Sequence, residues 1–118
     1  MPKRGKLLNE ETLVLVAERF RMLGDPVRLR LLQSLAEGEK SVTALVEESG
    51  ATQANVSKHL QHLLRAGLAS RRKDGLHVYY QVADPSVFDL CDAVCGSLTE
   101  QRARELSALR RSARTVRR

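Results

Sequence analysis

The chain has 118 residues, of which 42% are hydrophobic and 29% are charged, a balance that fits one globular domain and excludes a disordered chain. No apolar run approaches the roughly 20 residues that cross a bilayer, and no signal peptide follows the basic N-terminus. Two cysteines do not make the framework of a secreted disulfide protein. We therefore expect a cytoplasmic protein without membrane contact.

The net charge of +6 is unevenly distributed. Both ends of the chain are basic, and so is the segment 52–80, where Asp74 is the only acid. The basic residues of that segment are Lys58, Arg65, Arg71, Arg72 and Lys73. A local positive patch favours an anionic polymer as partner, and a solvated charged face is the alternative.

Two helices are predicted first. The segment 10–23 has one apolar face at helical spacing and stops at Gly24. Asp25-Pro26 is typical of a helix start, because Asp caps the free N–H groups and Pro suits the first turn. The second helix ends before Gly38. The apolar face of the first helix consists of Leu13, Val16, Ala17 and Phe20. The residues expected to be buried in the second helix are Leu29, Leu32 and Leu35.

Two more helices follow at once. The segment 41–49 is predicted as a short helix, and Gly50 is placed to be its left-handed cap. Thr52 caps a fourth helix that runs to about residue 66. Its apolar stripe consists of Val56, Leu60, Leu63 and Leu64.

The period then changes to two, which indicates strands. Asp74-Gly75 predicts a two-residue hairpin turn between strands over 68–73 and 76–82. Asp84-Pro85 begins a last helix that reaches about Arg111. The fold class is mainly α with a small β-hairpin, a winged helix-turn-helix. Residues 1–9 form a basic flexible N-terminus, 10–111 the winged helix-turn-helix domain, and 112–118 an Arg-rich tail.

The fourth helix is the predicted reading helix for double-stranded DNA. Its polar side chains suit base edges and phosphates in a major groove, and the basic hairpin suits phosphates or a minor groove. The candidate DNA-binding residues are Thr52, Gln53, Asn55, Ser57, Lys58, His59, Arg71, Arg72 and Lys73. The alternative is a solvated helix face, and for His59 and His62 a structural role is open beside a DNA-facing one.

Several segments resemble the ArsR/SmtB repressors, in the same order. They are LGDPVRLRLL at 23–32, TQANVSKHL at 52–60, LRAGL at 64–68 and RRKDGLHVYY at 71–80. The resemblance implies a homodimer through the first and last helices, and an operator-bound repressor that an inducer releases. Two metal sites of that family are not matched: residues 41–45 (SVTAL) lack thiols, and Asp84, Ser86, Ser97 and Glu100 lack imidazoles.

Cys91 and Cys95 share one face of the last helix. Three interpretations stay open: packing as small hydrophobes, redox or persulfide sensing, and binding of a thiophilic metal or metalloid. No cofactor is implied with certainty.

We predict a sequence-specific repressor released by a metal, a metalloid or a reactive sulfur species at these thiols. The alternative is a repressor without its own ligand. A protein-interaction domain is disfavoured by the basic hairpin. An enzyme is disfavoured because no phosphate loop or nucleophile motif is present.

Overall fold

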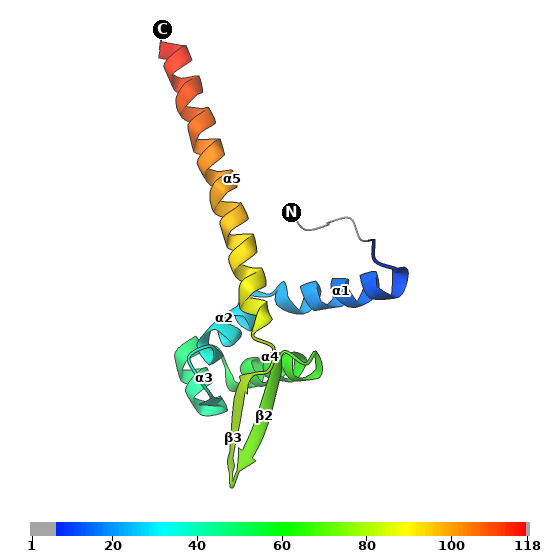
Figure 1. Ribbon diagram of the computed structural model, residues 1–118. Helices are drawn as coiled ribbons and strands as arrows, with labels where there is room; N and C mark the ends of the chain where they lie inside the picture. Colours follow the sequence, from blue (N-terminus) through cyan, green and yellow to red (C-terminus); the bar gives the residue numbers. More distant parts are fainter. Residues whose placement is uncertain (1–6, 118) are drawn as a thin grey trace. The chain divides into compact units, whose positions relative to one another are not determined.

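The computed structural model describes residues 7–117 and divides them into two compact units, 7–84 and 85–117. Figure 1 traces the elements in chain order. The predicted basic N-terminus lies outside the described residues over 1–6, and so does Arg118. None of the described helices carries an apolar stretch long enough to span a membrane.

The first two helices begin and end where the sequence predicts. Helix α1 (Glu10–Leu23) is capped by Asn9, whose Oδ1 accepts a hydrogen bond from the Thr12 N–H at 2.8 Å. Helix α2 (Pro26–Leu35) is capped by Asp25, which accepts from Val27 and Arg28. Each cap satisfies N–H groups that the first helical turn leaves free.

Helices α3 (Val42–Ser49) and α4 (Gln53–Arg65) form the helix-turn-helix. Ser41 and Thr52 cap them by accepting from backbone N–H groups three residues on. Gly50 has a φ of 71°, in the left-handed region that glycine adopts without strain. The predicted cap at Gly50 is therefore confirmed.

The hairpin consists of β2 (Ala69–Asp74) and β3 (His77–Val82). The predicted Asp74-Gly75 turn is wrong by one residue, because Asp74 pairs with His77 and leaves Gly75-Leu76 at the tip. Gly75 has a φ of 64°, and no non-glycine residue described has a positive φ. A glycine alone at the first turn position fits a type II′ turn, whereas type I′ needs positive φ at both positions.

A third strand was not predicted. Strand β1 (Lys40–Ser41) pairs with β3, so the sheet order is β1-β3-β2. Two residues carry no readable period, and β1 exists because β3 offers it a free edge.

The core of the first unit lies between α2, α3, α4 and the sheet. Its buried members include Leu31, Leu32, Leu35, Leu45, Val56, Leu60, Leu63 and Leu68. The predicted burial of Leu29 is wrong, since this side chain is 36% exposed while Leu31 and Arg28 are buried. Three leucines at 29, 31 and 32 leave the orientation of α2 ambiguous in the sequence, and packing against α4 decides it.

The second unit is the single helix α5 (Ser86–Arg117), of 32 residues. The predicted end at about Arg111 is wrong, because the helix continues through the residues assigned to a tail. Val94, Leu98, Leu106 and Leu109 are exposed on α5. On α1, the predicted apolar face is present, and Leu13, Val16 and Phe20 on it are exposed.

Candidate nucleic-acid interface

Helix α4 separates apolar from polar side chains. Val56, Leu60 and Leu63 are buried, whereas Gln53 and Lys58 are exposed and Asn55 and Ser57 are half-buried. Thr52 is also exposed, but its hydroxyl accepts from the Asn55 N–H at 3.1 Å. The exposed side therefore presents an amide, an ammonium group and hydroxyls near the helix N-terminus, which can contact base edges and phosphates.

A groove of about 300 Å³ runs between α4 and the hairpin. Gln53, Ser57 and Gln61 line one wall at successive turns of α4, and Arg71 and His77 line the other. At its floor Gln61 Nε2 lies 3.4 Å from the Tyr80 hydroxyl. Gln61 and His77 are missing from the predicted site, although the spacing of four from Ser57 to Gln61 could have identified Gln61.

The basic residues of the hairpin differ in their surroundings. Arg71 and Lys73 are exposed, and within residues 7–117 neither has an ion-pair partner. Arg72 donates to both carboxylate oxygens of Glu39 at 2.8 Å and lies 4.8 Å above the Tyr79 ring. The hydrogen bond from Arg72 lowers the pKa of Glu39, and the same bond raises the pKa of Arg72. The guanidinium of Arg71 and the ammonium group of Lys73 are thus available to phosphate, whereas Arg72 is already paired with Glu39.

His59 does not belong to the exposed side of α4. Its side chain is 7% exposed, and its Nδ1 lies 3.2 Å from Nη1 of Arg28. Burial lowers the pKa of His59, and the positive charges of Arg28, Lys58 and His62 lower it further, against the opposing effect of Asp25. The burial of His59 beside Arg28 of α2 disfavours its predicted DNA contact and favours the structural role.

The two cysteines of α5 are free thiols. Cys91 is half-buried and Cys95 is exposed. Over residues 7–117, no group of three or more His, Cys, Asp or Glu side chains gathers to hold a metal ion. Two thiols from one chain would therefore need further ligands from elsewhere to bind a three-coordinate metalloid.

Comparisons with known proteins agree with this geometry. Residues 25–71 match the family described as bacterial regulatory protein, arsR family. The chain is 46% identical over 74 residues to a Streptomyces lividans protein named "Probable mercury resistance operon repressor", and the match covers 63% of this chain and 59% of that protein. It is 41% identical over 88 residues to the HTH-type transcriptional regulator KmtR of Mycobacterium tuberculosis, covering 74% and 68% of the two chains.

The chain is also similar in structure to solved bacterial proteins. The crystal structure of M. tuberculosis Rv0081 superposes with a TM-score of 0.73 and 31% identity, over 83% of this chain and 99% of that chain. The homodimeric winged helix-turn-helix DNA-binding domain Mb0332 of Mycobacterium bovis superposes with a TM-score of 0.69 and 29% identity, over 84% and 95%.

Proposed function

Because the chain belongs to the ArsR family of DNA-binding transcriptional regulators, we propose that it represses transcription by binding an operator as a homodimer. The observation that carries this proposal is the groove between α4 and the hairpin, with Arg71 unpaired on one wall and Gln53 and Ser57 on the other. In this proposal α4 enters the major groove, and the hairpin contacts the adjacent phosphates.

Operator binding is tested by fluorescence anisotropy with the promoter duplex upstream of the chain's own gene. Replacing Gln53 and Ser57 by Ala should lower the ratio of operator to unrelated-DNA affinity, because amide and hydroxyl groups read base edges. Gln33→Ala is the matched control, since Gln33 is an exposed amide on α2 outside the groove. An unchanged ratio in the double variant would contradict the proposed reading surface.

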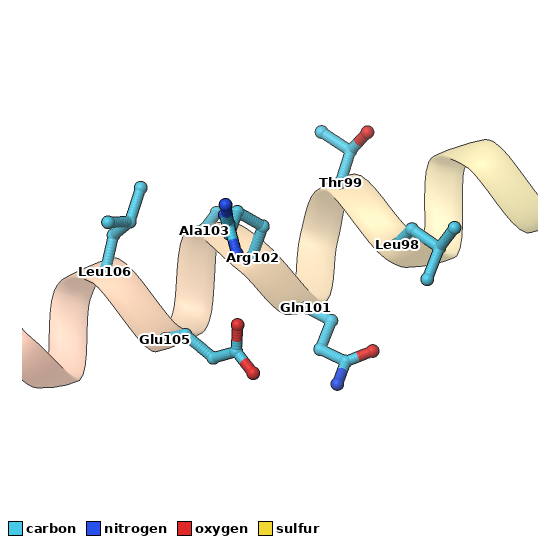
Figure 2. A pocket seen from close by; sticks show the side chains of 7 residues that line it. All are labelled: Leu98, Thr99, Gln101, Arg102, Ala103, Glu105 and Leu106. Carbon is cyan, nitrogen blue, oxygen red and sulfur yellow. The ribbon is translucent and has the colours of Figure 1, made fainter.

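The homodimer is supported by the two exposed apolar faces. Exposure of Val94, Leu98 and Leu109 on α5 to water is unfavourable in free energy, and the same holds for Leu13 and Phe20 on α1. Figure 2 shows Leu98 and Leu106 of α5 on either side of Arg102. The Mb0332 domain described above is homodimeric. Two copies of α4 in successive major grooves would lie about 34 Å apart.

We also propose that a thiophilic inducer releases the operator through Cys91 and Cys95. Their accessibility supports this, and so does the relative named for a mercury resistance operon. The test is operator release by mercury(II), arsenite, zinc, cadmium or a polysulfide, with a Cys91→Ser/Cys95→Ser variant beside the wild type. Release that the variant loses supports thiol sensing. Retained binding under all of these reagents leaves the repressor without a ligand at its cysteines.

A further inference from the structure

Arg28 joins two helices from a buried position. Its side chain is 8% exposed, and it shares the core with His59. Nε donates to the Met22 carbonyl at 2.7 Å, and Nη2 donates to the Arg21 carbonyl at 3.3 Å. Nη1 lies 3.2 Å from Nδ1 of His59 and 3.2 Å from Nδ1 of His62. One guanidinium therefore connects the end of α1 to the middle of α4.

The α1 side of this bridge suits a buried cation. Arg21 and Met22 lie in the last turn of α1, where carbonyls have no partner within the helix. The negative end of the helix dipole also points there, and it favours a positive charge. Arg28 thus satisfies the Met22 carbonyl and adds a second donor to the Arg21 carbonyl, which also accepts from the Gly24 N–H at 3.2 Å, while both carbonyls compensate its charge.

The α4 side of the bridge requires neutral imidazole. A guanidinium can only donate hydrogen bonds, so Nδ1 of His59 and Nδ1 of His62 must both accept. Each ring then carries its proton on Nε2. A proton on Nδ1 of His59 would remove the acceptor and place a second cation 3.2 Å from Arg28.

We propose that Arg28 is a positioning residue for operator binding, which fixes the reading helix α4 against the end of α1 through the neutral form of His59. This inference rests on the proposed function, since it assigns α4 to DNA reading and α1 to the dimer. Arg19 adds a second connection, because its Nη2 donates to the carbonyl of Ala66 at the end of α4. Arg28 differs from Arg19 in that its partners on α4 are titratable.

The charged groups around His59 set the sign of the pH dependence. Asp25 and Arg28 face it from α2 and its cap, and Lys58 and His62 act on it from α4 itself. Burial and the three basic neighbours together keep the pKa of His59 below its ordinary value. The contact between Arg28 and His59 is therefore intact near neutral pH. It is lost as the pH falls below the pKa of an ordinary histidine, about 6.5.

The experiment measures operator affinity from pH 8.0 to 5.0 at constant ionic strength. Simple electrostatics predicts tighter binding in acid, because protonated histidines add positive charge toward DNA. The positioning role predicts the reverse, a loss on the order of tenfold in the wild type. The double variant His59→Asn/His62→Asn should remove the loss, because Asn Oδ1 can accept from Arg28 but does not titrate. Gln33→Ala, on the exposed side of α2 outside the groove, is the control and should keep it.

A second variant tests Arg28 itself. Arg28→Lys keeps the charge, but one ammonium group cannot reach acceptors on both helices. We expect weaker operator binding at pH 8.0 and no further loss in acid, with a cooperative thermal transition that shows a folded protein. If Arg28→Lys or His59→Asn/His62→Asn shows the same loss of operator affinity in acid as the wild type, the positioning role is overturned. Absence of operator binding by the wild type at pH 8.0 would instead overturn the proposed function.

Discussion

Asp25 shows how much local structure one side chain determines. Its Oδ1 accepts from the Val27 N–H at 2.8 Å and from the Arg28 N–H at 3.2 Å. These bonds place the first turn of α2, and with it the buried Arg28. Partial burial alone would raise the pKa of Asp25, but the two backbone hydrogen bonds and the nearby positive charges lower it below its ordinary value.

Asp25→Ala should therefore lower the free energy of unfolding by about 1 kcal/mol at pH 7, as for other N-cap residues. The folded carboxyl has the lower pKa, so its stabilisation is present above the unfolded pKa of about 3.9 and disappears as the pH falls through the folded value. Urea unfolding of both proteins at pH 7 and pH 3 measures this. Asp25→Ser, whose hydroxyl can still cap the helix, should lower the free energy of unfolding by less than Asp25→Ala does. A gap between wild type and Asp25→Ala that widens in acid would contradict the assignment.

The neighbouring arginines of the hairpin provide a second prediction at this scale. Arg72 is held by Glu39, whereas Arg71 is unpaired and lines the groove. Arg71→Ala should weaken binding to all DNA sequences and lower the slope of log affinity against log salt by about one, because a phosphate contact is lost. Arg72→Ala should reduce the affinity for DNA and the salt slope by less than Arg71→Ala does.

Glu39→Gln tests the same pairing from the other side. It removes the carboxylate that Arg72 contacts, so Arg72 becomes available to phosphate and the salt dependence should steepen. Salt titrations of the three single variants on one duplex measure all of these slopes. Equal losses in Arg71→Ala and Arg72→Ala would show that the Glu39 pair does not hold Arg72 in solution.

At the scale of elements, the helices of the first unit were predictable because their signals are local. Asp25-Pro26, Thr52 and Gly50 each fix a boundary through their own backbone chemistry. What the sequence could not supply depends on tertiary partners. Strand β1 exists only beside β3, and Leu29 is exposed only because α2 turns Arg28 toward α4.

The candidate site shows the same limit. Gln53, Ser57 and Arg71 were predicted from residue type, and the structure places them on one groove. The burial of His59 could not be read from the sequence, because its partner Arg28 lies 31 residues away. Glu39 was missed for the same reason, since its contact with Arg72 spans 33 residues.

Gly50 permits a prediction about the helix-turn-helix as an element. At a φ of 71° any Cβ is strained, although the space around it is open. Gly50→Ala should therefore destabilise the protein by about 1 kcal/mol, whereas Gly50→Asn should cost less because Asn tolerates the left-handed region. Thermal unfolding of the two variants gives the comparison, and equal stability would mean that the turn relaxes to another backbone conformation.

At the scale of the whole molecule, the exposed apolar side chains of α5 are the main feature that one chain leaves unexplained. Leu98 is 59% exposed and Leu109 is 66% exposed, and both lie on α5. Helix faces of this kind are covered in stable proteins, and a second copy supplies an identical face under two-fold symmetry. In the proposed homodimer, DNA binding by two copies of α4 would then depend on α5.

Leu98→Glu should weaken the dimer at least tenfold, because the loss of a buried leucine is worth about 1.5–3 kcal/mol and a charge at a symmetric contact repels its copy. Sedimentation equilibrium measures the association constant directly. Leu76→Glu is the control, since Leu76 is fully exposed at the hairpin tip and should leave the dimer intact. Operator affinity should fall in Leu98→Glu in parallel with the dimer and recover at high protein concentration, because the reading helices themselves are unchanged. A Leu98→Glu protein that remains dimeric would place the interface elsewhere, and α1, with Leu13 and Phe20 exposed, would then be the face to alter.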